Sequence, residues 1–237
     1  MRQIGIIAGL RSELRRLGAG GALPAHLVAF AAGGSPARAR AEALRWAAEG
    51  RVAALASFGL CGGLDPSLSP GDVVVAHRVV FTDGGALEFD ARWAEAIAAR
   101  IPGARIAPIL GAGDLAAGAA EKRALFERHA ASAIDMESRG VAEAAHDAGL
   151  PFVALRAVAD PADRTLPRAA AHAVDERGRV RVARVLLGLA GRPGDLGALM
   201  AVGGDARRAH AALAAAAARA LHPDLVPLAP RDAPVTP

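Results

Sequence analysis

Short apolar runs alternate with stretches of helical spacing along most of the chain. Seven runs predict strands: Gln3–Ala8, His26–Ala32, Val52–Phe58, Asp72–Val80, Arg105–Leu110, Ala133–Met136 and Phe152–Val158. Helices are predicted between and after them: Arg11–Leu17, Pro36–Glu49, Asp90–Arg100, Ala120–His129, a segment ending near Ala148, Val180–Leu189 and Gly194–Leu221. This alternation predicts an α/β protein, a single-domain three-layer αβα sandwich around a central mixed β-sheet.

Local signals place several boundaries. Ser35 is a suitable N-cap for the helix that Pro36 opens, and Gly50 is a suitable stop. We expect residues 1–222 to form one domain. Residues 223–237 hold five prolines and are predicted to be a loose Pro-rich tail on the surface.

Composition excludes several classes of protein. The 237 residues are 53% hydrophobic and 22% charged, which excludes a disordered chain, a collagen-like fibre and a coiled coil. The net charge is only +4, and the pI of about 10.7 is high because Lys122 is the only lysine, arginines supply the other bases, and tyrosine is absent. With 3% aromatic residues and no basic cluster, we expect no nucleic-acid partner.

Cysteine usage and hydropathy indicate the compartment. The single cysteine, Cys61, excludes an internal disulfide and is interpreted as a buried thiol rather than a nucleophile. No Cys/His spacing predicts a metal site. The apolar run Ile4–Leu10 is too short for a signal peptide, and no run approaches the 18 or so residues of a membrane span. We expect a cytoplasmic protein without a transmembrane segment.

Chemically useful residues follow four predicted strands, where ligands collect in open α/β sheets. The segments are Ala8–Glu13, Ser57–Pro66, Asp135–Ser138 and Arg156–Asp163. Each has a purely structural alternative. Glu13 would be an exposed helix residue, the glycines of the second segment would shape a turn, Glu137 would complement a helix dipole, and Asp160 before Pro161 would be an N-cap.

Together and in this order, the four segments resemble the purine nucleoside phosphorylase and nucleosidase superfamily. They are most similar to its methylthioadenosine/adenosylhomocysteine nucleosidases, over roughly residues 2–163. Ile4–Leu14 resembles the first strand and acidic loop of that branch, and Gly59–Val75 resembles its Gly-rich loop. Asp160 follows Glu137 by 23 residues, the spacing of that branch. The resemblance implies a nucleoside phosphorylase-like fold.

The C-terminal third resembles a narrower group. Leu166–Val180 and Arg192–Leu199 are similar to the hopanoid-associated phosphorylases of hopanoid-producing bacteria. That resemblance implies release of adenine from adenosylhopane to give ribosylhopane. The alternative substrates are the soluble nucleosides methylthioadenosine and adenosylhomocysteine. A non-enzymatic binding or scaffold role is a third hypothesis, against which the retained Glu13, Glu137 and Asp160 argue.

The family resemblance assigns a role to each acid. Cleavage of the ribose–purine bond passes through an oxocarbenium-like state, and adenine leaves poorly as an anion. Asp160 matches the acid that protonates the purine, so its pKa must rise, because an ordinary Asp with a pKa of about 3.9 is protonated about one time in a thousand at pH 7. Glu137 matches the ribose-binding carboxylate, Met136 packs on the sugar, and Glu13 matches the base that activates water.

The nucleophile and the base pocket depart from the family pattern. Ser57 and Leu60 stand where hexameric phosphorylases place the Arg and Ser that bind phosphate, so hydrolysis is favoured. Arg11, with Gly62 of the Gly-rich loop, is the candidate substitute contact for a phosphate co-substrate in the alternative, phosphorolysis; we expect no other cofactor. Ala116 stands where nucleosidases have a stacking Phe, which leaves backbone contacts from Ala116 and Ala117 to the purine.

Assembly and membrane contact are expectations of the same kind. Superfamily members are commonly oligomeric, so we expect a homodimer. Four arginines around residue 180 could contact anionic lipid, although a solvated helix face explains them more simply. These are Arg177, Arg179, Arg181 and Arg184.

Overall fold

The structure is a computed structural model that describes residues 3–18, 21–114, 116, 118–165 and 196–225. Its strands form one ten-stranded mixed sheet in the order β6-β5-β8-β9-β3-β10-β4-β7, with β1 beside β3 and β2 beside β1. The strands are β1 Gln3–Ala8, β2 Leu27–Ala31, β3 Val52–Gly63, β4 Val73–Ala76, β5 Arg78–Phe81, β6 Ala86–Glu88, β7 Arg105–Ile106, β8 Ile109–Gly111, β9 Ala133–Asp135 and β10 Phe152–Asp160. The helices are α1 Arg11–Leu14, α2 Pro36–Ala48, α3 Ala91–Ala98, α4 Ala119–His129, α5 Ser138–Asp147 and α8 Leu196–Ala220, followed by the 3-10 turn η2 Pro223–Leu225.

Two long strands form the middle of the sheet. β3 pairs in parallel with β1 along its first half and with β10 along its second half, and its last residues pair antiparallel with β9. β10 lies between β3 and the antiparallel β4. Both strands are almost entirely buried, as expected of strands covered on both faces.

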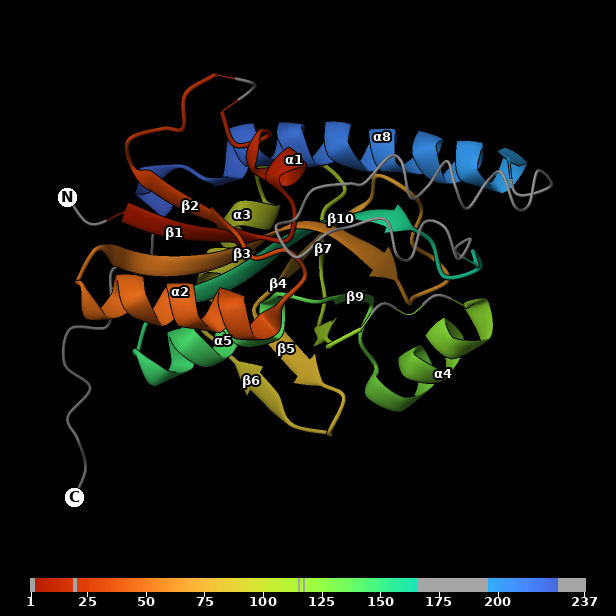
Figure 1. Cartoon of the computed structure of the whole chain (residues 1–237), viewed down its shortest axis with the longest axis horizontal. Helices are drawn as coiled ribbons and strands as arrows, with labels where there is room; N and C mark the ends of the chain where they lie inside the picture. Colours follow the sequence, from red (N-terminus) through yellow and green to blue (C-terminus); the bar gives the residue numbers. More distant parts are fainter. Residues whose placement is uncertain (1–2, 19–20, 115, 117, 166–195, 226–237) are drawn as a thin grey trace.

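Alternate side chains of these strands enter two separate cores. Val153, Leu155 and Ala157 of β10 pack with α3 and α8 on one face, whereas Ala154 and Val158 pack with α2 and α5 on the other. Figure 1 shows α8, α1 and α3 on one side of the sheet and α2 and α5 on the opposite side. The three-layer αβα sandwich with a mixed sheet is therefore confirmed.

Helix boundaries follow the predicted signals. The Ser35 hydroxyl accepts a hydrogen bond from the Arg38 amide at 3.3 Å, and Pro36 is the first residue of α2. Gly50 and Gly149, just beyond α2 and α5, have φ of 62° and 61°, the left-handed conformation that ends a helix.

The structure divides each of two predicted strands into two shorter strands. Asp72–Val80 divides at His77 into β4, which pairs with β10, and β5, which pairs with β6 and β8. The chain bends at His77. The Phe89 amide donates a hydrogen bond to the His77 carbonyl oxygen at 2.9 Å, and the Phe89 carbonyl oxygen accepts one from the Nδ1 of the His77 ring at 3.1 Å. Arg105–Leu110 divides in the same way into β7 and β8, before and after Pro108, which has no amide hydrogen for a ladder.

Other predictions need correction. The Gly-rich segment after Phe58 is not a loop, because β3 continues through it to Gly63. The helix α1 ends at Leu14 instead of Leu17. The short strand β6 was not predicted. Asp160 is not a helix N-cap, since it ends β10 and is followed by a turn closed by the bond from Arg164 N to Pro161 O. The predicted helix at 180–189 and most of the predicted tail lie outside the described residues. No helix in the described part of the chain is long and apolar enough to cross a membrane.

Candidate active site

Glu13 lies in a buried position formed by two chain segments. The helix α1 is a single turn, and the carboxylate of Glu13 accepts hydrogen bonds from the Leu10 amide at 2.7 Å and the Leu60 amide at 2.8 Å. Its side chain is 3% exposed, so the structural alternative of a surface glutamate is wrong. Burial raises the pKa of Glu13, while the nearby Arg156 and the two amides act in the opposite direction.

Gly59 allows β3 to approach this carboxylate. A Cβ at this position would lie 2.7 Å from the Glu13 Cδ and 2.8 Å from the Arg156 Nη1, and its φ of 153° is one that other residues rarely adopt. Strand β3 therefore needs glycine here to hold the acid and the guanidinium against its backbone.

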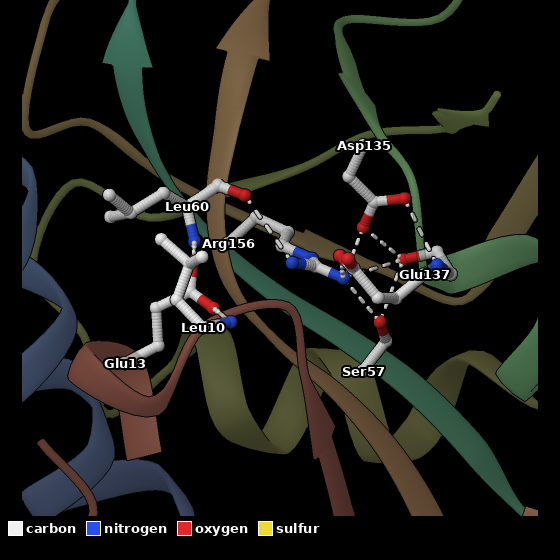
Figure 2. Close-up of polar contacts among 8 residues, drawn as sticks. Leu10, Glu13, Ser57, Leu60, Asp135, Glu137 and Arg156 are labelled. Atoms are coloured by element: carbon white, nitrogen blue, oxygen red, sulfur yellow. Dashed lines mark hydrogen bonds and ion pairs between the residues drawn. The ribbon is translucent and has the colours of Figure 1, made fainter. Parts of the chain in front are cut away.

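Arg156 is the centre of the polar cluster, and Figure 2 shows its guanidinium between the Glu13 side and the Asp135 side. It projects from β10 and is fully buried. It forms ion pairs with Asp135 and, at 3.4 Å, with Glu137. It also donates to the Ser57 hydroxyl at 2.5 Å and to the Leu60 carbonyl at 3.3 Å. A buried guanidinium held by this many acceptors is fixed in place.

Asp135 joins this cluster to the start of α5. One of its oxygens accepts from the Ser138 amide at 3.0 Å, and the other accepts from the Ser138 hydroxyl at 2.5 Å, so the aspartate caps the helix. Glu137, the residue just before α5, is thereby held with its carboxylate toward Arg156 and Gly9.

The cluster contains more acids than bases. Glu13, Asp135 and Glu137 surround the single cation Arg156, and all four groups are buried. Burial raises the pKa of Glu137, with Arg156 opposing the rise and Asp135 and Glu13 adding to it. A buried site with more carboxyl groups than cations favours binding of hydroxyl groups, water or developing positive charge, and disfavours binding of an anion.

Asp160, at the end of β10, lies on the other side of the site. Its Oδ2 accepts a hydrogen bond from the ammonium of Lys122 at 2.5 Å, whereas its buried Oδ1 has no hydrogen-bond partner among the described residues. Burial raises the pKa of Asp160 despite the opposing effect of Lys122. A Cβ at Gly62 would lie 3.9 Å from Oδ2, so Gly62 faces Asp160.

Glu13 and Asp160 meet the same strand, β3, at different positions. Glu13 touches β3 at Gly59 and Asp160 approaches β3 at Gly62, three residues along the strand. At about 3.3 Å per residue, these two positions on β3 are roughly 10 Å apart along the strand. Met136 adjoins the Glu137 end, where its Cε lies 3.4 Å from the position that a Cβ would occupy at Gly34.

The remaining predicted residues lie less centrally. Arg11 is exposed and makes no ion pair with a described residue, so it does not join the polar cluster. Ala116 is buried in the small core that includes Leu64 and Ile134, and Ala117 lies outside the described residues. Burial raises the pKa of the Cys61 thiol, which keeps it protonated. In the part of the chain that the structure describes, no group of three or more His, Cys, Asp and Glu side chains is arranged to hold a metal ion.

Sequence reasoning missed several of the residues that build this site. It assigned no role to Arg156, Asp135, Ser57 and Lys122. The signals were an arginine within an otherwise apolar strand and a lysine that occurs once in the chain, and either could have been flagged as a buried charge in need of partners. Their partners come from distant segments, and sequence alone did not reveal them.

Comparison with known proteins now identifies the family. A sequence profile described as the Phosphorylase superfamily matches residues 21–190, more than half of the chain. The chain belongs to the Phosphorylase superfamily. The predicted superfamily is thus confirmed, while the roles assigned to individual residues stay predictions.

Solved structures share the Phosphorylase superfamily fold with this chain. A Helicobacter pylori 5'-methylthioadenosine/S-adenosyl homocysteine nucleosidase is 16% identical with a TM-score of 0.67, and the match covers 91% of this chain and 95% of that one. A Streptococcus pneumoniae MTA/SAH nucleosidase in complex with 8-aminoadenine is 23% identical with a TM-score of 0.62, covering 79% and 98%. A futalosine hydrolase of Helicobacter pylori is 18% identical with a TM-score of 0.59, covering 68% and 88%. At these identities the likeness establishes the fold.

Proposed function

We propose that the protein is a nucleosidase that hydrolyses the N-ribosidic bond of an adenosine-type nucleoside and releases adenine. The observation that carries this proposal is the separation of one partly free aspartate, Asp160, from a buried cluster of three carboxylates and one guanidinium. An acid for the leaving base and a negatively charged end for the sugar and the nucleophile are the two parts that this chemistry needs.

At the base end, Asp160 is the proton donor. Its buried Oδ1, which has no hydrogen-bond partner among the described residues, bonds to a purine nitrogen, and its raised pKa increases the fraction of the acid that carries a proton near neutrality. Proton transfer to the leaving group in the transition state is typically worth about 10²- to 10⁴-fold in rate.

At the sugar end, Glu137 binds ribose hydroxyls and Met136 packs against the ring. Each hydrogen bond to this carboxyl group contributes about 0.5–1.5 kcal/mol, and about 1.5–3 kcal/mol when the group is ionised, enough to orient the sugar. The excess of carboxylates also stabilises the positive charge that develops on the ribose as the bond breaks.

Water is the nucleophile that this charge balance favours. Phosphate would need a free cation, but the guanidinium of Arg156 is already engaged by Asp135, Glu137 and Ser57. Arg11, the other candidate, is exposed and does not join the polar cluster. Glu13 accepts the proton of the attacking water, and the amides of Leu10 and Leu60 hold its carboxylate in place.

Within the class of adenosine-type nucleosides, we propose adenosylhopane as the substrate and ribosylhopane as the product. The support is the resemblance of Leu166–Val180 and Arg192–Leu199 to hopanoid-associated phosphorylases, together with Ala116, whose small side chain leaves room for a bulky substrate. Most of the first support lies outside the described residues. The nucleosidases of similar fold make methylthioadenosine and adenosylhomocysteine the necessary comparison substrates.

The test is release of adenine by the purified protein from detergent-dispersed adenosylhopane and from methylthioadenosine, each with and without inorganic phosphate. Equal release in both buffers, with the free sugar as product, is the expected result. Dependence on phosphate with a sugar phosphate as product would show a phosphorylase. Release from methylthioadenosine alone would retain the chemistry and reject the lipid, and release from neither would reject the proposed function.

A further inference from the structure

Lys122 is the only lysine in the chain, and its side chain is completely buried. It lies in the first turn of α4, on a helix whose neighbouring residues Glu121 and Arg123 are exposed. Burying an ammonium group is costly unless it is paired and hydrogen-bonded, so its surroundings must satisfy its charge and its three hydrogens.

Three acceptors surround this ammonium. Its Nζ lies 2.5 Å from the Asp160 Oδ2, 2.9 Å from the Pro161 carbonyl oxygen and 3.0 Å from the Arg164 carbonyl oxygen. The three N–H groups of the ammonium therefore have three acceptors, and these acceptors all lie at the end of β10 or in the turn that follows it. Lys122 binds this turn to α4 and holds one oxygen of Asp160.

Lys122 binds only one of the two carboxyl oxygens of Asp160. Oδ2 is bonded to Lys122, whereas Oδ1 is buried and has no hydrogen-bond partner in the described part of the chain. A proton on Oδ2 would compete with the ammonium for the same oxygen. The proton of the neutral acid is therefore directed to Oδ1, the oxygen left free for a ligand.

We propose that Lys122 is a positioning residue for the reaction, which holds Oδ2 of Asp160 so that the transferable proton lies on Oδ1 and points toward the leaving base. This inference rests on the proposed function. It adds a residue on α4 to a site otherwise built from α1, β3, β9, β10 and the start of α5. Because α4 follows Ala116 directly, the same contact joins the acid to the predicted purine-binding segment.

Lys122 also counteracts the effect of burial on Asp160. Burial raises the pKa of Asp160; Lys122 on α4 and Arg164 in the following turn lower it, and Asp205 on α8 raises it. Cys61 on β3, whose thiol is protonated, is a further titratable neighbour. Lys122 is the cation in hydrogen-bond contact, so its removal is expected to raise the pKa of Asp160 further and to make its proton harder to transfer.

A kinetic experiment tests the role through two variants and a matched control. Lys122→Met removes the charge and keeps much of the length, Lys122→Arg keeps the charge, and Arg123→Met removes an exposed cation from the next position of α4. We expect Lys122→Met to lower kcat for adenine release at pH 7 by at least about tenfold and to move the alkaline limb of the kcat profile upward by about one pH unit. Lys122→Arg should leave the limb in place, and Arg123→Met should change neither quantity.

Spectroscopy tests the pairing without relying on activity or on the folding of a variant at Lys122. Because the chain has one lysine, protein carrying ¹³C at the lysine Cε gives one lysine signal, provided the purification tag contains none. We expect this signal to titrate with Asp160, to lose that titration in Asp160→Asn, and to shift when adenine is added. A signal at the position of an exposed lysine, unaffected by Asp160→Asn, would overturn the pairing.

The outcomes separate the two proposals. Active wild-type protein whose alkaline limb is the same in Lys122→Met would overturn the role of Lys122 and leave the proposed function standing. Absence of adenine release from both nucleosides would remove the proposed function, and with it the catalytic role of Lys122.

Discussion

The backbone at Gly9 lies so close to Glu137 that a Cβ on Gly9 would be 2.7 Å from the Oε1 of that carboxylate. Real Cβ atoms do not approach an oxygen so closely, and Glu137 is confined by Arg156 and by the start of α5. The residue that follows the first strand thus lies against the predicted ribose-binding acid.

Gly9→Ala is therefore expected to displace the Glu137 carboxylate while leaving the fold intact. We predict a fall in kcat/KM for adenine release of about 10- to 100-fold, of the size expected when a positioned group is moved. Gly203→Ala, on α8 where an added Cβ meets nothing within 4 Å, is the matched control and should be as active as wild type. Equal activity of the two variants would show that Glu137 does not need this position.

Arg156→Met should abolish activity and weaken the fold. It leaves Glu13, Asp135 and Glu137 buried without their cation, and breaking a buried ion pair costs about 3–5 kcal/mol. Urea denaturation measures this loss of unfolding free energy. Arg92→Met, at an exposed arginine paired only with Asp90 among the described residues, should leave both activity and the denaturation midpoint unchanged.

Glu137→Gln should alter how stability depends on pH. Burial raises the pKa of Glu137, so the folded protein holds its proton more tightly than the unfolded chain. The resulting stabilisation is complete below the unfolded pKa, about 4.3, and is lost as the pH rises through the higher folded value. Glutamine does not titrate, so the melting temperature of the variant, relative to wild type, should be higher at pH 8 than at pH 4.5.

The control for this comparison is Glu127→Gln, at an exposed position on α4, whose relative melting temperature should be the same at both pH values. The predicted direction of the pKa shift would be contradicted if the melting temperature of Glu137→Gln, relative to wild type, were lower at pH 8 than at pH 4.5.

Asp160→Asn should be selective in its effect on substrates. For adenosine-type nucleosides we predict a loss in kcat of about 10²- to 10⁴-fold, because adenine then leaves without a proton donor. A nucleoside methylated on the corresponding purine nitrogen already carries the positive charge and should be cleaved with little loss. Glu13→Gln should impair both substrates, since the water must be activated in either case. An equal loss on both substrates in Asp160→Asn would show that Asp160 is not the acid.

The strands, and the segments that meet at the candidate site, could be predicted from the sequence because they depend on residues that are close together along the chain. The apolar runs located β1, β2 and β10, and the motifs around Glu13, Glu137 and Asp160 pointed to the segments that meet at the site. Division of the strand at His77 was not predicted, because Val73–Ala76 and Arg78–Phe81 have the same apolar character and differ only in the strands that they join.

The roles of the two buried cations could not be predicted from neighbouring residues. Arg156 and Lys122 each depend on carboxylates from other segments of the chain, which the sequence around them does not reveal. Arg11, two residues before Glu13, is the candidate phosphate contact of the alternative, phosphorolysis, and its side chain is exposed. The cation that acts on Glu13, Arg156, comes from β10 and is far from it in sequence.

The position of β10 has a consequence for how the protein is made. It is the last strand of the described chain, yet it lies between β3 and β4, which are synthesised long before it. Until it arrives, those two strands expose unpaired edges, and any direct pairing between them would close the gap that β10 must fill. The same strand carries Arg156 and Asp160. An unfinished chain that lacks β10 therefore has open sheet edges and lacks two of the charged side chains of the candidate site.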